Sequence, residues 1–194
     1  MLDLETLGLN LGSGIIQIGV VFFDPDAGVD SPIESYSVSA NVRQDGNTVV
    51  DPATVDWWKD TDEPLYHELM ERSERAMSIS DAIGELRALF ERHAPQCVWA
   101  KRPAFDIAQL NLRMQELGIE PFWKFYKVFD CATVTETILR LTGIKPVMSR
   151  DSALRAHDGE ADAVHQVRLL QQCLATPIHA ISHNQSADRL IAAR

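Results

Sequence analysis

The hydrophobic pattern of the chain changes its period near Asp51, and this change constrains the fold more than any other feature. Before Asp51 lie three segments typical of strands, and residues 15–23 (IIQIGVVFF) are the most apolar and β-branched of them. The other two are residues 2–5, which alternate apolar and acidic, and residues 33–42 (IESYSVSANV). Short links join the three, so we expect an antiparallel meander.

After Asp51 the apolar residues recur at helical spacing. Two short apolar segments, residues 97–100 and 127–130, interrupt this pattern and predict further strands. We expect Ser80 to be the N-cap of a helix. Helices are predicted over residues 52–59, 64–75, 81–93, 103–117, 132–141 and 160–174. Three strands followed by alternating helices and strands predict an α/β fold, a mixed sheet flanked by helices.

The composition fits one globular domain, which we place at residues 1–175. The chain has 194 residues, 45% of them hydrophobic and 24% charged, enough to bury a core. The polar tail, residues 176–194, is either a short docking helix or disordered. No apolar run approaches the roughly 18 residues that span a bilayer, and the first residues are acidic rather than basic, so we expect a soluble cytoplasmic protein with no membrane partner.

Three cysteines, an odd number without CxxC spacing, argue against both a disulfide framework and a zinc site. The formal net charge of −10 argues at first against a polyanionic partner. The charge is divided, however. Residues 1–100 hold 18 acids and 6 bases, whereas residues 101–194 hold 10 acids and 12 bases. The second half could therefore present a basic surface.

Carboxylates stand out at two places in this pattern. Asp3 and Glu5 are two apart on the first strand, so they project from one face of it. They repel each other unless a cation lies between them, although a solvated edge strand would also explain them. Asp106 follows the strand over residues 97–100, in the first turn of a helix. This is where α/β proteins commonly place functional groups, and also where an acid suits a helix N-terminus.

A histidine and a third acidic position come later in the chain. His157 precedes Asp162 by five residues, and Asp162 begins a helix whose next turns are apolar. A lone histidine would be structural in most proteins. Beside an acid, in a chain with two other candidate carboxylate positions, His157 is a candidate base next to a metal site.

Together these segments resemble the three motifs of the DEDDh, or DnaQ-like, 3′–5′ exonucleases, over about residues 1–175. The motifs are Asp3-Leu4-Glu5-Thr6-Leu7-Gly8, Phe105-Asp106, and His157 with Asp162. Further matches resemble the subgroup with phage-type exodeoxyribonucleases and bacterial 3′–5′ exoribonucleases. They are the FFDPDAG turn, the helix with Thr54-Val55-Asp56-Trp57-Trp58, and the stretch from Trp123-Lys124-Phe125 to Asp130.

The resemblance implies an RNase H-like fold and a metal-dependent 3′–5′ exonuclease. It implies that two divalent ions, Mg²⁺ or Mn²⁺, are held by Asp3, Glu5, Asp106 and Asp162. His157 would then deprotonate the attacking water, and nucleoside 5′-monophosphates would leave from the 3′ end of a nucleic acid. Carboxylate oxygens suit such hard cations, and an imidazole suits proton abstraction near neutrality. DNA and RNA both remain open as substrates, and relatives make a homodimer an expected assembly.

The same likeness implies that Thr6, Leu7 and Gly8 line a pocket for the terminal nucleotide, with Leu7 packing on a base and Phe105 nearby. A strand exit with a glycine turn would equally explain the first three. Adjacent residues on a helix point about 100° apart, so one of Trp57 and the tryptophan after it reaches the core. The other, Trp57, is a candidate for stacking on a base, although burial of both tryptophans is the interpretation that we favour.

One departure from the family pattern concerns the residues before Phe105. Related motifs often read G-N-G there, whereas this chain has Ala100-Lys101-Arg102. We expect Lys101 and Arg102 to bind a substrate phosphate, with a solvated loop as the alternative. Asp130 is expected to cap the next helix rather than to take part in catalysis. A catalytically silent nucleic-acid-binding domain is the alternative function, because a fold alone does not guarantee activity.

Overall fold

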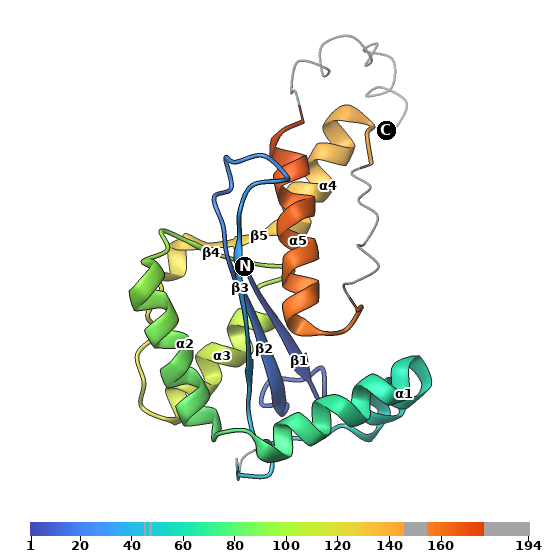
Figure 1. Ribbon diagram of the computed structural model, residues 1–194, viewed down its shortest axis with the longest axis vertical. Helices are drawn as coiled ribbons and strands as arrows, with labels where there is room; N and C mark the ends of the chain where they lie inside the picture. The colour runs from blue at the N-terminus through green and yellow to red at the C-terminus, as the bar shows by residue number, and fades with distance from the viewer. Residues whose placement is uncertain (45, 47, 146–154, 177–194) are drawn as a thin grey trace, which may run out of the picture.

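The computed structural model describes residues 1–44, 46, 48–145 and 155–176 (Figure 1). In this part of the chain the strands are β1 (Leu2–Thr6), β2 (Ile15–Phe22), β3 (Glu34–Ser39), β4 (Val98–Ala100) and β5 (Val128–Asp130). The helices are α1 (Pro52–Arg75), α2 (Ile79–His93), α3 (Asp106–Glu116), α4 (Cys131–Thr142) and α5 (Gly159–Leu174), with a short 3₁₀ helix η1 (Phe125–Lys127) before β5.

The strands form one mixed sheet in the order β3-β2-β1-β4-β5. β1, β2 and β3 pair antiparallel, whereas β4 and β5 run parallel to β1. This confirms the predicted mixed α/β sheet with three initial antiparallel strands. β1 therefore lies at the centre of the sheet, where neighbouring strands fix the positions of its side chains.

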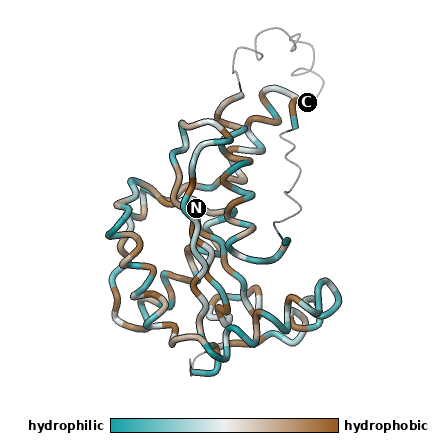
Figure 2. Tube along the Cα trace, viewed as in Figure 1, coloured by the Kyte–Doolittle hydropathy of each residue, from teal (hydrophilic) through white to brown (hydrophobic). Residues whose placement is uncertain are grey.

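Helices cover both faces of the sheet (Figure 1). α2 and α3 pack on one face, where Leu2 and Leu4 of β1 join Leu86 and Leu110 in the main core. α4 and α5 cover the other face, with Val167 in a smaller core. Because strand side chains alternate, Asp3 and Glu5 point to the α5 face. Figure 2 shows brown, hydrophobic stretches along the strands and teal, hydrophilic stretches on much of α1.

α1 lies across the end of β1 and β2 and contains a kink. Asp51 caps its first turn, and Asp62 has non-helical backbone angles where Pro64 follows. Pro64 has no N–H to continue the helical ladder, and the amide of Leu65 instead donates to Asp62 Oδ1 at 3.1 Å. The two helices predicted over residues 52–59 and 64–75 are therefore the two arms of α1.

Several predicted boundaries are wrong by a few residues. Ser80 is not the N-cap of α2, because Ser78 Oγ accepts the amide of Asp81 three residues later and the helix begins at Ile79. The helix predicted from residue 103 begins at Asp106, because Arg102 has a positive φ of 67° and a turn precedes the helix. β3 is shorter than the predicted residues 33–42.

Two further expectations, for Asp130 and for the cysteines, hold. Asp130 caps α4 by accepting the amide of Ala132, and all three cysteines are free. Among the described residues, none of the helices is long and apolar enough to cross a membrane. The limits of the domain, residues 1–175, stay a prediction, and the tail from residue 177 lies outside the described residues.

Candidate active site

The site forms where the N-terminus of α5 meets β1 and β2, and a glycine permits this approach. A Cβ built on Gly19 of β2 would lie 2.0 Å from the carbonyl oxygen of Gly159. The amide of Gly159 also donates to Oε1 of the buried Gln17 at 2.8 Å. The backbones of β2 and α5 are therefore in direct contact at this crossing. This contact brings Asp162, one turn into α5, close to the carboxylates of β1.

Three carboxylates converge as a result. Oxygens of Asp3, Glu5 and Asp162 all lie within 4.8 Å of one another. Nε2 of Gln166, one turn beyond Asp162, donates to Asp3 Oδ1 at 2.6 Å and orients that carboxylate. A register shift in the pairing of β1 with β2 comes directly after Glu5, an irregularity of the kind often found beside functional sites.

Asp106 is bound to the backbone of the same strand. It is the first residue of α3 and is buried, and its Oδ1 accepts the amide of Leu4 at 3.1 Å. Its charge raises the pKa of Asp3, second only to burial, so the two carboxyls are neighbours. The structure thus places Asp106 beside the three converging carboxylates rather than within their group.

Burial and mutual repulsion shift the pKa of these groups upward. Burial is the largest cause at each, and it raises the pKa of Asp106 to about 7. At Asp3 the pKa rises to about 8, with the charges of Asp106 and Asp162 contributing. At Glu5 it rises to about 10, with Asp3 the largest charged contributor. The ionised cluster is therefore unfavourable on its own.

These residues fit a divalent cation. The donors are carboxylate oxygens, the ligands that Mg²⁺ and Mn²⁺ prefer, and they lie close enough to share an ion. A cation would reverse the cause of the raised pKa values, because it stabilises the ionised carboxylates that burial and repulsion disfavour. Structural zinc sites, by contrast, are built mainly from cysteine and histidine.

His157 lies between this cluster and α1. Its amide donates to Asp162 Oδ2 over a long 3.4 Å, and its backbone has a positive φ of 63°. The ring makes edge-on contacts with Trp57 and Trp58, with centroids 5.1 and 6.1 Å apart. The two adjacent tryptophans differ: Trp58 is 2% exposed in the core, whereas Trp57 is 46% exposed, so burial of both is wrong.

A pocket of about 380 Å³ opens beside Glu5, between the end of β1 and the start of α1. Trp57, Phe105 and Thr6, all predicted to contact substrate, line it. Leu7 does not, because it is 2% exposed and packs in a core cluster with α1. Leu9, 75% exposed, lines the pocket where Leu7 was expected.

Gly8, which was predicted to line the pocket together with Thr6, is explained by packing. A Cβ there would lie 2.5 Å from Ser13 Oγ, so the glycine allows the loop after β1 to close on itself. Its carbonyl accepts the hydroxyl of Thr6 at 2.8 Å, which fixes that hydroxyl beside the pocket.

Lys101 and Arg102 follow β4, and Lys101 lies near the acidic cluster. The ammonium of Lys101 lowers the pKa of both Asp3 and Asp106, in opposition to burial. Both basic side chains are exposed. The amide of Arg102 donates to Asp130 Oδ1 at 3.1 Å, which ties this turn to the start of α4. The turn therefore presents two cations at the rim of the site.

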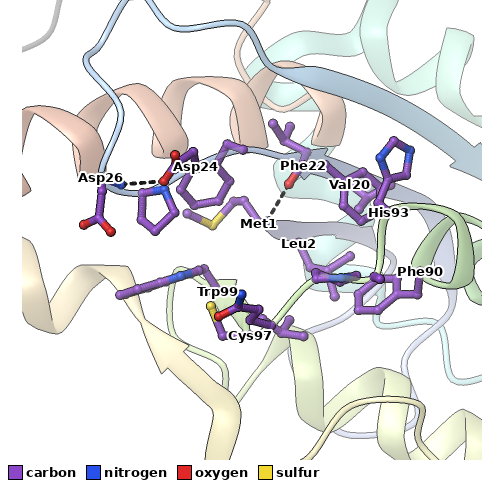
Figure 3. Close-up of a pocket in the computed structure, with 17 residues that line it drawn as sticks. Met1, Leu2, Val20, Phe22, Asp24, Asp26, Phe90, His93, Cys97 and Trp99 are labelled. Carbon is purple, nitrogen blue, oxygen red and sulfur yellow. Dashed lines mark hydrogen bonds between the residues drawn. The ribbon is translucent and has the colours of Figure 1, made fainter.

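A larger cavity, of about 460 Å³, lies at the start of β1 (Figure 3). Met1, Leu2, Phe22, Phe90, His93, Cys97 and Trp99 are among its lining residues. None of the five predicted catalytic residues, which are all described in the structure, lines it. Size alone therefore does not locate the chemistry of this molecule.

Sequence reasoning missed four residues of the site. They are Gln17, Gly19, Gln166 and Leu9. A glycine within the apolar run of residues 15–23 was a usable signal, since glycine inside a strand often marks a close backbone approach. The two glutamines gave no such signal, because their partners lie far away in the chain.

A solved structure has the same fold. The nuclease domain of 3′hExo, a DEDDh family member bound to rAMP, superposes with a TM-score of 0.58 at 16% identity, covering 89% of each chain. The two chains share an RNase H-like fold, and in this chain acidic residues of the central strand β1 and of α5 gather at one place on its five-stranded mixed sheet.

The family model of the 3′-5′ exoribonuclease Rv2179c-like domain matches residues 1–174. The chain belongs to this family and is a 3′–5′ exonuclease, a hydrolase that acts on nucleic acid. The comparison with curated protein sequences found no match.

Proposed function

We propose that the chain is a metal-dependent exoribonuclease that releases nucleoside 5′-monophosphates from the 3′ end of RNA. The observation that carries this proposal is the convergence of Asp3, Glu5 and Asp162 beside a pocket lined by Glu5 and Trp57. RNA, rather than DNA, is proposed because the family is described by its exoribonuclease domain. The proposed cofactors are two divalent ions, Mg²⁺ or Mn²⁺, with Asp106 as a further ligand.

Bound divalent ions would stabilise the attacking and leaving oxygens of an in-line displacement. The four carboxylates would hold these ions, and the hydrogen bond from Gln166 keeps Asp3 oriented. His157 accepts the proton of the attacking water at an imidazole nitrogen, the role that histidine most often takes as a general base. Its neighbour Trp57 lines the pocket, so the proposed base and the terminal nucleotide share one wall.

The pocket holds the terminal nucleotide by apolar contact. Trp57, Phe105 and Leu9 present ring and side-chain surface to a base, and each stacked base is worth about 1 to 3 kcal/mol. Lys101 and Arg102 bind the phosphate at the rim. Because both are exposed, they contribute to encounter and positioning rather than to the chemical step.

The decisive experiment uses 5′-labelled single-stranded RNA and DNA of matched sequence, with Mg²⁺, Mn²⁺ or EDTA. We expect a ladder that shortens from the 3′ end of RNA, with nucleoside 5′-monophosphate as product and no shortening in EDTA. Asp162→Asn is the inactive control. Binding without shortening would indicate the silent nucleic-acid-binding domain, and a preference for DNA would contradict the substrate. The proposed homodimer is tested separately by light scattering on a sizing column.

A further inference from the structure

The segment that carries His157 is attached to α1 by an arginine outside the three motifs. Arg155 Nη2 donates to Asp62 Oδ1 at 2.6 Å, and its Nε donates to Asp62 Oδ2 at 3.0 Å. Its Nη1 reaches Glu68 Oε2 at 3.2 Å. One guanidinium thus bridges two carboxylates on the two sides of Pro64, and the bond to Asp62 is bidentate, the geometry that favours arginine over lysine.

The acceptor is well suited to this role. Asp62 lies at the kink of α1, and its Oδ1 also accepts the amide of Leu65 at 3.1 Å, so its carboxylate is fixed to the helix. The bond from Arg155 is the largest cause of a lowered pKa at Asp62. The pair is exposed, and single exposed ion pairs contribute little to stability. The ion pair between Arg155 and Asp62 therefore matters for the position of the chain rather than for stability.

His157 needs such fixing. Its positive φ of 63° places it in the left-handed region, which costs free energy for a residue other than glycine and persists only when surrounding contacts hold it. Arg155 holds the chain two residues before it. One residue after it, Asp158 Oδ2 lies 3.6 Å from Arg72 Nη1 on the second arm of α1. The ring itself contacts Trp57 and Trp58 on the first arm.

We propose that Arg155 is a positioning residue for the reaction, which acts by holding the His157 segment on the kink of α1. The inference rests on the proposed role of His157 as the base. α1 then carries both a wall of the nucleotide pocket, through Trp57, and the support of the base, through Asp62 and Glu68. The nucleotide pocket and the proposed base therefore both rely on α1.

The first test measures kcat and KM of Arg155→Gln. We expect kcat to fall about tenfold with KM within about twofold, because a displaced base loses its alignment while the pocket is unchanged. Arg155→Lys should recover part of the loss. Asp62→Asn, which can still accept the amide of Leu65, should match Arg155→Gln, and the double variant should lose no more than either. Arg75→Gln removes an exposed pair with Glu71 on the same helix and is the matched control.

The second test does not depend on activity. Indole emission senses the ring beside Trp57 and Trp58, so Arg155→Gln should change tryptophan fluorescence. In a His157→Ala background the same substitution should change neither fluorescence nor kcat. Equal effects in both backgrounds, or a loss in KM alone, would overturn the positioning role.

The two proposals fail in different ways. If His157→Ala leaves kcat unchanged, the proposed base is wrong and the role of Arg155 falls with it. If His157→Ala lowers kcat while Arg155→Gln changes neither kcat nor fluorescence, only the positioning role is overturned, and the proposed function stands.

Discussion

The carboxylates and the histidine of this site are held in two different ways. Asp3 and Glu5 belong to the central strand, and Asp106 and Asp162 lie in the first turns of two helices packed on it. These four are fixed by the contacts that fold the domain. His157 is instead held by exposed ion pairs and ring edges on α1. The acidic side chains of the site are therefore part of the core, whereas we expect that the segment of His157, the proposed base, can be displaced without unfolding the domain.

The largest effect is expected for Asp3→Asn. It removes a carboxylate that has no substitute, so we expect activity to fall by at least about 10³-fold, as for other removals of a central catalytic group. Folding should not suffer, because burial and neighbouring charges already raise the pKa of Asp3 to about 8. Nucleotide release and thermal unfolding in EDTA measure the two effects.

Asp56→Asn changes an exposed acid on α1 and is the control. Normal activity of Asp3→Asn would remove Asp3 from the site. A large loss of stability in EDTA would instead show that the Asp3 carboxylate stabilises the fold, and would contradict the expectation that folding does not depend on its charge.

His157→Ala should slow turnover by about 10² to 10⁴-fold, the range for loss of a general base. Stabilisation by Mn²⁺ should be unchanged, since the carboxylates remain. Turnover and the Mn²⁺ dependence of the melting temperature are the measurements. A variant that no longer gains stability from Mn²⁺ would make the histidine a ligand and erase the difference between the two parts of the site.

Gly19→Ala tests whether the close contact between β2 and α5 positions the carboxylates. The new Cβ would lie 2.0 Å from backbone of Gly159, so β2 and α5 must separate. We expect a loss of roughly 3 kcal/mol in unfolding free energy, typical of overpacking, together with lost activity as Asp162 moves. Chemical denaturation measures the first. Gly84→Ala, with nothing within 4 Å, should stabilise α2 by about 0.5 to 1 kcal/mol. Tolerance of Gly19→Ala would mean that α5 is not fixed by this contact.

The same division explains what the sequence could predict. Asp3, Glu5, Asp106, His157 and Asp162 could be proposed from the sequence, because periodicity assigns residues to faces and the motifs carry their spacing, and their roles stay predictions. Burial of both tryptophans was the favoured interpretation, and the exposure of Trp57 shows that it is wrong. The capping serine was misplaced by two residues, since Ser78 and Ser80 both lie near the start of the helix and only the Asp81 amide, which donates to Ser78, decides between them. The antiparallel pairing of β1, β2 and β3 followed from the meander, whereas no local pattern placed β4 and β5 on the other side of β1.

Contacts between distant side chains could not be predicted. Leu7 and Leu9 have the same chemistry, and their opposite exposures depend on how the loop after β1 turns. Gln109 and Arg113 of α3 hold that loop through Asn10 and Gly12, about a hundred residues earlier. Arg155 and Asp62 are likewise 93 residues apart. Local patterns carry no signal for such pairs.

Divalent ions should stabilise the protein more as pH rises. Asp3, Glu5 and Asp106 have pKa values raised to about 8, 10 and 7, above their unfolded values. The metal-free fold retains their protons, so their contribution is full below pH about 4 and is lost as pH rises through 7 to 10. Mn²⁺ at a hundred times its Kd adds about 2.7 kcal/mol, or roughly 5 to 10 °C in melting temperature. Scanning calorimetry at pH 6 and 8.5 measures this, and equal metal-induced shifts at both would contradict the raised pKa values.

The smallest effect is expected at the rim, which belongs to neither part of the site. Lys101→Ala combined with Arg102→Ala should raise KM about fivefold at low salt and leave kcat nearly unchanged, because exposed cations act on a phosphate through screened charge. The loss should shrink as salt increases, so the slope of log KM against log salt falls. Removal of Lys101 also withdraws a charge that lowers the pKa of Asp3 and Asp106. Arg102→Ala alone isolates the phosphate contact from that effect. An unchanged KM and salt slope would mean that both residues belong to a solvated loop and do not bind substrate. A fall in kcat seen only when Lys101 is replaced would mean that this rim residue acts on the charge of the buried carboxylates.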